Sequence, residues 1–111
     1  MEISFKSEKL RKLCTEQRIA VREHGSVRAN KIRVRLDDMA AAENLAVMRT
    51  LPGHYHELTG DRKGQLAVSL DGPYRLIFEP ANEPVPCNAD GGLSWVEVTA
   101  VRILEIVDYH D

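Results

Sequence analysis

The sequence predicts an α+β fold in a single domain of residues 1–111, in which an N-terminal strand and helices pack on one face of a small, mainly antiparallel sheet. Helical periodicity is confined to the first half of the chain, and strand-like alternation dominates the second half. Helices that precede a run of strands are typical of α+β proteins. A length of 111 residues is enough for one hydrophobic core.

The first half begins with a strand and continues with helices. Residues 2–6 alternate Ile3 and Phe5 with polar neighbours, as a short strand does. Ser7 is a suitable N-cap for the following helix, because its side-chain oxygen can accept a backbone N–H. A further helical stretch is expected to end near Gly25.

The clearest predicted helix runs from Ser26 to about Ala42. Apolar side chains recur in it at intervals of three and four residues, which predicts one buried stripe with charged side chains largely off it. The stripe consists of Ala29, Ile32, Leu36, Met39 and Ala40, and the charged side chains are Arg28, Lys31, Arg33, Arg35 and Asp38. Residues 43–49 are predicted to continue helically, and Pro52 with Gly53 ends the helical region.

A β-hairpin is predicted around a three-residue turn formed by residues 71–73. This turn places Leu70 opposite Tyr74, Val68 opposite Leu76 and Leu66 opposite Phe78, so the large apolar side chains share one face. A two-residue turn would shift the pairing by one and scatter them over both faces. Arg75 is the only cation of this hairpin, and it is predicted to project from the other, polar face.

A loop and a last strand follow the hairpin. Residues 80–94 contain three prolines and two glycines and are predicted to form a loop, whose purpose the sequence leaves open. Residues 95–107 are rich in β-branched side chains and become nearly apolar on both faces, as a strand central in the sheet would be.

The charge distribution is uneven along the chain. Residues 1–35 carry ten Lys and Arg against four Glu, whereas residues 36–111 carry five against thirteen Asp and Glu. The basic half could attract a polyanion or an acidic partner protein, or it could serve solubility alone. A pI near 6.1 disfavours nucleic-acid binding by overall charge, so any RNA site must be local.

Composition also bears on location and on the thiols. No apolar run approaches the ~18 residues that a membrane span needs. The first ten residues lack the layout of a secretory signal, so a cytoplasmic location is expected. Cys14 and Cys87 are far apart and lack a Cys-x-x-Cys spacing, which favours reduced thiols over a disulfide or a zinc site.

Histidine and arginine side chains suggest acid–base chemistry on a phosphate. A ribonuclease needs a base for the 2′-hydroxyl proton, an acid for the leaving oxygen and a cation for the growing charge on phosphorus. His56, His110 and Arg75 are of these types, and histidine can be base or acid near neutral pH without a metal. His54 and His56 could instead be metal ligands, but no third ligand is near in sequence, so no metal or other cofactor is predicted.

The last residues could complete such a site. Tyr109 offers a ring on which an unstacked RNA base could lie, and Asp108 could orient His110 or Arg75. The plainer interpretation of this polar segment is a solvated chain end.

Three segments resemble the RelE/ParE superfamily of bacterial toxins, most closely the plasmid-maintenance killer proteins of HigB type. They are HELTGDRKGQ (residues 56–65), GPYRLIFEP (residues 72–80) and EIVDYH (residues 105–110). The resemblance implies a microbial-RNase-like α+β fold, ribosome-dependent cleavage of mRNA and inhibition by a cognate antitoxin protein. It also implies site residues, which are His56, Arg75, Asp108, Tyr109 and His110.

The chain departs from the family pattern at Thr59, where well-known members have a lysine. Thr59 cannot neutralise a phosphate, and Arg62 or Lys63 on the same loop could substitute as RNA-binding cations. An acidic antitoxin segment is expected to cover residues 9–35, and the cations expected to bind it are Arg28, Lys31 and Arg35. Oligomers are expected only through the antitoxin complex.

Two functions therefore stay possible. The first is a ribosome-dependent endoribonuclease toxin, which the terminal His110 favours. The second is a non-nucleolytic binding protein of the same fold, either a gyrase-poisoning relative or a degenerate toxin that chiefly binds its antitoxin. Thr59 and the acidic pI favour the second.

Overall fold

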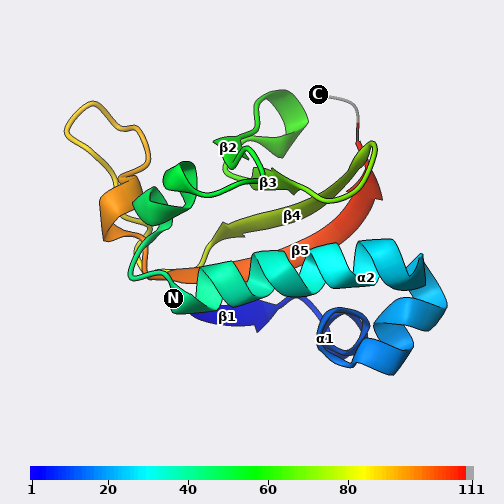
Figure 1. Cartoon of the computed structure of the whole chain (residues 1–111). Coiled ribbons are helices and arrows are strands. Elements are labelled where there is room, and N and C mark those ends of the chain that lie inside the picture. The colour runs from blue at the N-terminus through cyan, green and yellow to red at the C-terminus, as the bar shows by residue number, and fades with distance from the viewer. Residues whose placement is uncertain (110–111) are drawn as a thin grey trace.

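A five-stranded sheet forms the centre of the fold, in the order β1-β5-β4-β3-β2. The computed structural model describes residues 1–109. β1 (Glu2–Phe5) runs parallel to β5 (Ala100–Asp108), and the other neighbouring strands are antiparallel. Helix α2 crosses one face of this sheet, and α1 packs against α2 (Figure 1). The predicted α+β class, with helices on one face of a mainly antiparallel sheet, is confirmed.

Helix α1 (Glu8–Thr15) begins where the sequence predicts, and helix α2 (Gln17–Ala41) breaks at the predicted position, Gly25. The Ser7 hydroxyl caps α1 by accepting the N–H of Leu10 at 3.1 Å. Gly25 interrupts α2 with φ 79° and ψ 162°, a conformation that glycine adopts without the steric cost of a Cβ. The segment after Gly25 is the predicted long helix.

The buried stripe of α2 differs from the predicted one at two positions. Ile32, Leu36 and Met39 are buried as predicted. Ala40 is exposed, whereas Arg35 is only 6% exposed, so the prediction that Arg35 lies off the buried stripe is wrong. The physical reason is an acceptor on the sheet, since Arg35 Nε donates to the Ser69 carbonyl oxygen at 2.9 Å.

The hairpin of β3 (Leu66–Ser69) and β4 (Tyr74–Pro80) has the predicted register. Val68 lies opposite Leu76 and Leu66 lies opposite Phe78. These four side chains join the main core beneath α2, together with α2 residues and the β5 residues Val101 and Ile103. A one-residue slip would expose them, so burial fixes the register.

The polar face predicted for the hairpin is partly apolar. Ala67 and Ile77 are buried in a second cluster with Leu58, and Leu104, Val107 and Tyr109 pack against it. We call the side of the sheet that carries this cluster, opposite α2, the second face. Arg75 does project from it, because Arg75 pairs with Val107.

Several boundaries differ from the sequence prediction. Residues 95–97 form a 3-10 helix, η3 (Trp95–Glu97), and not the start of the last strand. Its backbone turns because the N–H of Glu97 donates to Ser94 O and that of Val98 to Trp95 O. The predicted helix over residues 43–49 is the 3-10 helix η1 (Leu45–Thr50).

Short elements also appear between η1 and the hairpin, around the loop that carries Thr59, Arg62 and Lys63. β2 (His56–Glu57) pairs with β3, and η2 (Gly60–Arg62) follows it. The long loop after the hairpin begins one residue later than predicted, because Pro80 is the last residue of β4. Both cysteines are free thiols, as predicted. Among residues 1–109, no helix is both long enough and apolar enough to cross a bilayer.

Candidate functional site

Two neighbouring rows of side chains cross the second face. The first row consists of His56, Ala67, Ile77 and Glu105, which are successive register partners on β2, β3, β4 and β5. The second row consists of Ser69, Arg75 and Val107. Partners in a register share a face, so His56 and Arg75 project from the same side of the sheet. Standard sheet spacings put their Cα atoms about 12 Å apart, within reach of a long arginine and one phosphate group.

A tight local turn orients His56. Its Nδ1 lies 2.8 Å from the backbone oxygen of His54, and the two imidazole rings stack with centroids 4.4 Å apart. A carbonyl oxygen can only accept, so Nδ1 carries the hydrogen and Nε2 is the basic nitrogen of the neutral ring. The turn also needs Gly53, since a Cβ there would lie 2.6 Å from Val68 Cγ2.

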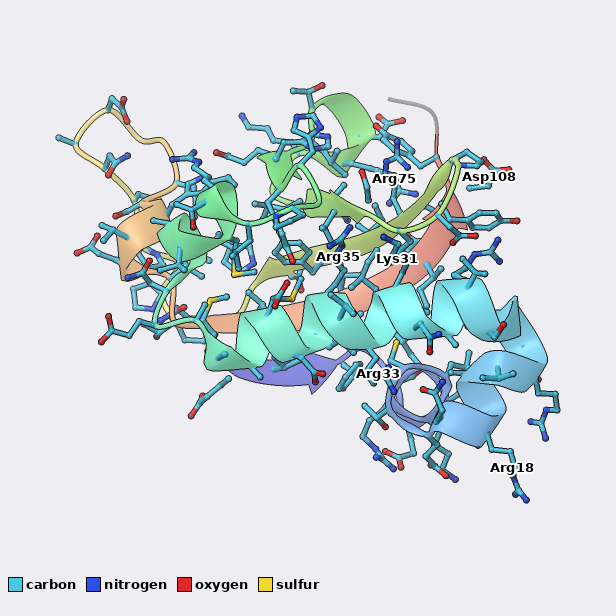
Figure 2. The ribbon with its side chains drawn as sticks, in the orientation of Figure 1. Arg18, Lys31, Arg33, Arg35, Arg75 and Asp108 are labelled. Carbon is cyan, nitrogen blue, oxygen red and sulfur yellow. The ribbon has the colours of Figure 1, made fainter. Side chains whose placement is uncertain are left out.

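The hairpin turn positions Arg75. Its Nη1 donates to the carbonyl oxygens of Gly72 at 2.9 Å and Tyr74 at 3.0 Å. These contacts hold the guanidinium beside the turn, at one end of the second face. Figure 2 shows Arg75 at this end of the hairpin, close to the end of β5.

The end of β5 lies along the start of β4, as the proposed site requires. The Tyr109 N–H donates to Pro73 O at 2.9 Å, and the Tyr109 ring packs against the second cluster. Asp108 pairs with Tyr74, whose side chain packs on the core side beneath α2. Alternation along β5 therefore puts Asp108 on the face opposite Arg75. His110 lies outside the described residues.

Arg62 is a further cation of this face. Its Nη1 donates to Gln65 Oε1 and to Glu105 Oε2, both at 3.1 Å, and its Cζ lies 5.5 Å from the centroid of the Tyr109 ring. His56, Arg75, Tyr109 and Arg62 thus lie on the same side of the sheet, and Arg62 is the one that lies close to the Tyr109 ring. Glu105 belongs to the same group, and sequence reasoning missed it. Alternation along β5 could have placed its side chain here, but the bulge opposite Ile77 and Phe78 could not be foreseen.

The three helix cations do not form one exposed patch. Arg35 is buried, and Arg28 is held against the hairpin by its ion pair with Asp71, with Nε and Oδ1 2.9 Å apart. Only Lys31 of the three is exposed. A partner that binds this helix by charge would therefore not use Arg35.

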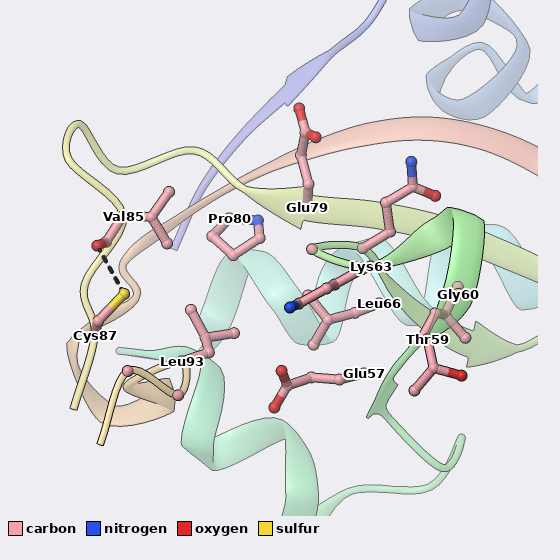
Figure 3. Close-up of a pocket in the computed structure, with 15 residues that line it drawn as sticks. Glu57, Thr59, Gly60, Lys63, Leu66, Glu79, Pro80, Val85, Cys87 and Leu93 are labelled. Carbon is pink, nitrogen blue, oxygen red and sulfur yellow. Dashed lines mark hydrogen bonds between the residues drawn. The ribbon is translucent and has the colours of Figure 1, made fainter. Parts of the chain in front are cut away.

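Lys63 belongs to a different feature, a pocket of about 670 Å³ between η2 and the loop of residues 81–94. Its charged end and that of Glu57 point into this pocket, while Leu66, Pro80 and Leu93 form apolar walls (Figure 3). We call it the loop pocket. The sequence signal for it is the length of the Pro- and Gly-containing loop, whose purpose the sequence left open.

Within residues 1–109, no group of three or more His, Cys, Asp or Glu is arranged to hold a metal ion. His54 and His56 stack on one another and do not converge on a common point.

Comparison with protein-family models gives no match for this chain, and no curated protein matches it at a significant level.

Proposed function

We propose that this chain is a metal-free endoribonuclease that cuts mRNA on the ribosome in the cytoplasm, as the toxin of a type II toxin–antitoxin pair. The observation that carries the proposal is the presence of His56 and Arg75 on one sheet face, with the Tyr109 ring beside them. The resemblance of three sequence segments to HigB-type toxins of the RelE/ParE superfamily is the second support. A cognate antitoxin protein would hold the enzyme inactive.

The proposed reaction is an intramolecular transesterification at one phosphodiester of the RNA, in which the 2′ oxygen replaces the 5′ oxygen on phosphorus. His56 Nε2 takes the 2′-hydroxyl proton, and the 2′ oxygen attacks phosphorus. The bond from phosphorus to the 5′ oxygen breaks, and His110 donates the proton that this oxygen needs. The products are a 2′,3′-cyclic phosphate and a 5′-hydroxyl. The step consumes no water, and the proposal assigns no metal to it.

Arg75 supplies the positive charge in this proposal. The phosphorane-like transition state carries more charge on its oxygens than the ground state does, and a fixed guanidinium stabilises that difference. Tyr109 offers a face for an unstacked base, as is common in recognition of single-stranded RNA. Arg62 would exchange its contact with Glu105 for an RNA phosphate.

A second candidate is a binding protein of the same fold that does not cut RNA. Glu105 favours it, because this carboxylate stands in the same row as His56 and pairs with Arg62. Thr59 favours it as well, since it is exposed and carries no charge. Both features make the site less attractive to a phosphate than a wholly basic face would be.

Induced expression followed by mapping of transcript 5′ ends tests the proposal. The wild type should halt growth and create new 5′ ends in translated mRNAs, and these ends should vanish when ribosomes are inactive. Arg75→Ala should lower cleavage by about 100-fold, because one charge-stabilising donor is typically worth that much. His110→Ala should restore growth in the same assay.

Matched variants separate chemistry from folding. Arg102→Ala removes an arginine from the same sheet, where it pairs with Glu79 away from His56, and it should leave cleavage intact. His54→Asn should also leave cleavage largely intact, since asparagine tolerates the φ of 55° at this position and the backbone carbonyl remains. Growth arrest without new 5′ ends would favour the binding protein. Arrest that survives both Arg75→Ala and His110→Ala would remove these residues from the site.

A further inference from the structure

Three charged side chains line the loop pocket above apolar walls, namely Lys63, Glu57 and Glu79, and Glu79 is paired with Arg102. The charged ends of Lys63 and Glu57 both reach toward its interior (Figure 3). Leu66, Pro80 and Leu93 provide an apolar lining against which a ring can pack. A purely aliphatic ligand would leave both charged groups without a ligand partner. The pocket therefore suits a ring with a polar edge and an attached anion.

One pocket carboxylate oxygen is already fixed. Glu57 Oε2 accepts the indole N–H of Trp95 at 2.9 Å, and Trp95 in turn lies beneath Arg49, whose Cζ is 3.7 Å from its ring centroid. This contact holds the Glu57 side chain in one orientation, so the acceptor is preorganised. A preorganised carboxylate recognises hydrogen-bond donors and rejects acceptors.

The loop pocket is continuous with the candidate site along the chain. Glu57 follows His56 in β2, and Lys63 follows Arg62. β2 is an edge strand, so a ligand can pass around it from one side of the sheet to the other. A strand of RNA bound at His56 would thus have its neighbouring nucleotide close to Glu57 and Lys63.

We propose that the loop pocket is a nucleobase subsite that takes a base with an exocyclic amino group, cytosine or adenine, and disfavours uracil. The inference rests on the proposed function, because it assigns the pocket to the RNA that the nuclease would cut. Glu57 accepts from the amino group, as acidic side chains do from cytosine N4. Uracil presents a carbonyl oxygen at the same place, which a carboxylate repels. Lys63 binds the phosphate of that nucleotide.

Two readouts follow binding without any need for cleavage. Trp95 is the only tryptophan of the chain and touches Glu57, so its fluorescence reports occupancy of the pocket. Cys87 is exposed and lines the pocket, whereas Cys14 is buried, so a bound nucleotide should slow alkylation of Cys87 by iodoacetamide. Cytidine 5′-monophosphate and uridine 5′-monophosphate are matched probes, since their bases differ only along the edge that Glu57 would contact. Cytosine has an amino group at C4 and an unprotonated N3, whereas uracil has a carbonyl oxygen at C4 and an N–H at N3.

The wild type should bind the cytidine nucleotide about tenfold more tightly than the uridine nucleotide, the discrimination expected of one specific base contact. Glu57→Gln should bring this ratio to about one or below it, because the amide oxygen can keep the Trp95 bond while its N–H donates to the uracil oxygen. Lys63→Ala should weaken both nucleotides alike. Glu97→Gln, a change in η3 outside the pocket lining, should keep the tenfold ratio.

Equal affinity of the wild type for both nucleotides would overturn the subsite, and so would a ratio that Glu57→Gln leaves unchanged. This failure is distinct from failure of the nuclease proposal. Base selectivity in a protein that makes no transcript cuts would support the subsite proposal and contradict the nuclease proposal. Transcript cuts by a protein without base selectivity would support the nuclease proposal and contradict the subsite proposal.

Discussion

Arg35 joins α2 to β3 through a buried guanidinium. Its Nε donates to the Ser69 carbonyl oxygen at 2.9 Å, and a Cβ at Gly53 would come within 3.1 Å of the same nitrogen. The Ser69 N–H in turn donates to Gly53 O at 2.8 Å. Arg35 therefore supports the backbone turn from which His56 projects, although it does not reach the second face itself.

Arg35→Met should lower the free energy of unfolding by about 2 kcal/mol. The variant keeps an unbranched stem of similar length but leaves the Ser69 carbonyl oxygen without its charged donor, and such losses cost about 1.5–3 kcal/mol. Urea unfolding measures the change. Arg33→Met removes an exposed cation from the same helix and should cost less than about 0.5 kcal/mol. Equal effects of the two substitutions would contradict the structural role of Arg35.

The burial of Arg35 shows a limit of inference from periodicity. Arg35 directly precedes the buried Leu36, so its position is near the edge of the apolar stripe, where both burial and exposure are compatible with the pattern. The burial of Arg35 is decided by its hydrogen bond to the backbone oxygen of Ser69, a residue far away in the sequence. No local signal identifies such a partner, whereas Ile32 and Met39 lie centrally in the stripe and could be predicted.

At the scale of elements, the part of α2 that follows the break at Gly25 is held against the hairpin turn. Arg28 pairs with Asp71, and its Cζ lies 3.3 Å from the centroid of the Tyr74 ring. His24 lies four residues earlier, directly before the break at Gly25, and its Nε2 is buried with no hydrogen-bond partner among the described residues. Burial and the charge of Arg28 lower the pKa of His24, and Glu23 and Asp71 oppose this shift.

The lowered pKa of His24 predicts that the free energy of unfolding depends on pH. The unfolded His24 binds a proton more readily than the folded one, so its share of stability is present above the ordinary pKa of 6.5 and is lost as the pH falls below it. His24→Gln removes this titration. The wild type should therefore lose more stability than the variant between about pH 7.5 and about pH 5.5. Parallel curves of unfolding free energy against pH for the two proteins would contradict the prediction.

Elements differ in how well the sequence specifies them. The hairpin register could be predicted because only a three-residue turn keeps Val68 and Leu76 on one face. The start of the last strand could not be predicted. Trp95 has a high strand propensity, but it lies in η3, where its indole N–H donates to Glu57. β2 is only two residues long and exists because β3 offers it a partner, so it has no period to detect.

At the scale of the whole molecule, the fold depends on pairing between the two ends of the described chain. β1 runs parallel to β5, with Ile3 opposite Val101 and Phe5 opposite Ile103. The sequence predicted both strands but carried no signal for their pairing, since the partners lie at opposite ends of the chain. β5 also pairs with β4, and this second pairing places the end of β5 next to the hairpin turn. The proposed site thus depends on the complete sheet and not on one motif.

Cys14 offers a probe of that global cooperativity. It is 6% exposed and belongs to the main core, where burial raises the pKa of its thiol to about 12. Cys87 is exposed in the loop after the hairpin. The native protein should therefore react at one thiol with a disulfide reagent near pH 8, because the thiolate is the reactive species and Cys14 is neither ionised nor accessible.

In a Cys87→Ser variant, the remaining thiol should react only through unfolding of the core. Its rate should then rise with urea in proportion to the population of unfolded protein measured by circular dichroism, as expected when exchange proceeds by global opening. Cys14→Ser with Cys87 retained is the matched control, and its thiol should react quickly and almost independently of urea. A Cys14 that reacts as fast as Cys87 in the absence of urea would show that α1 opens on its own, and that the core does not unfold as one unit.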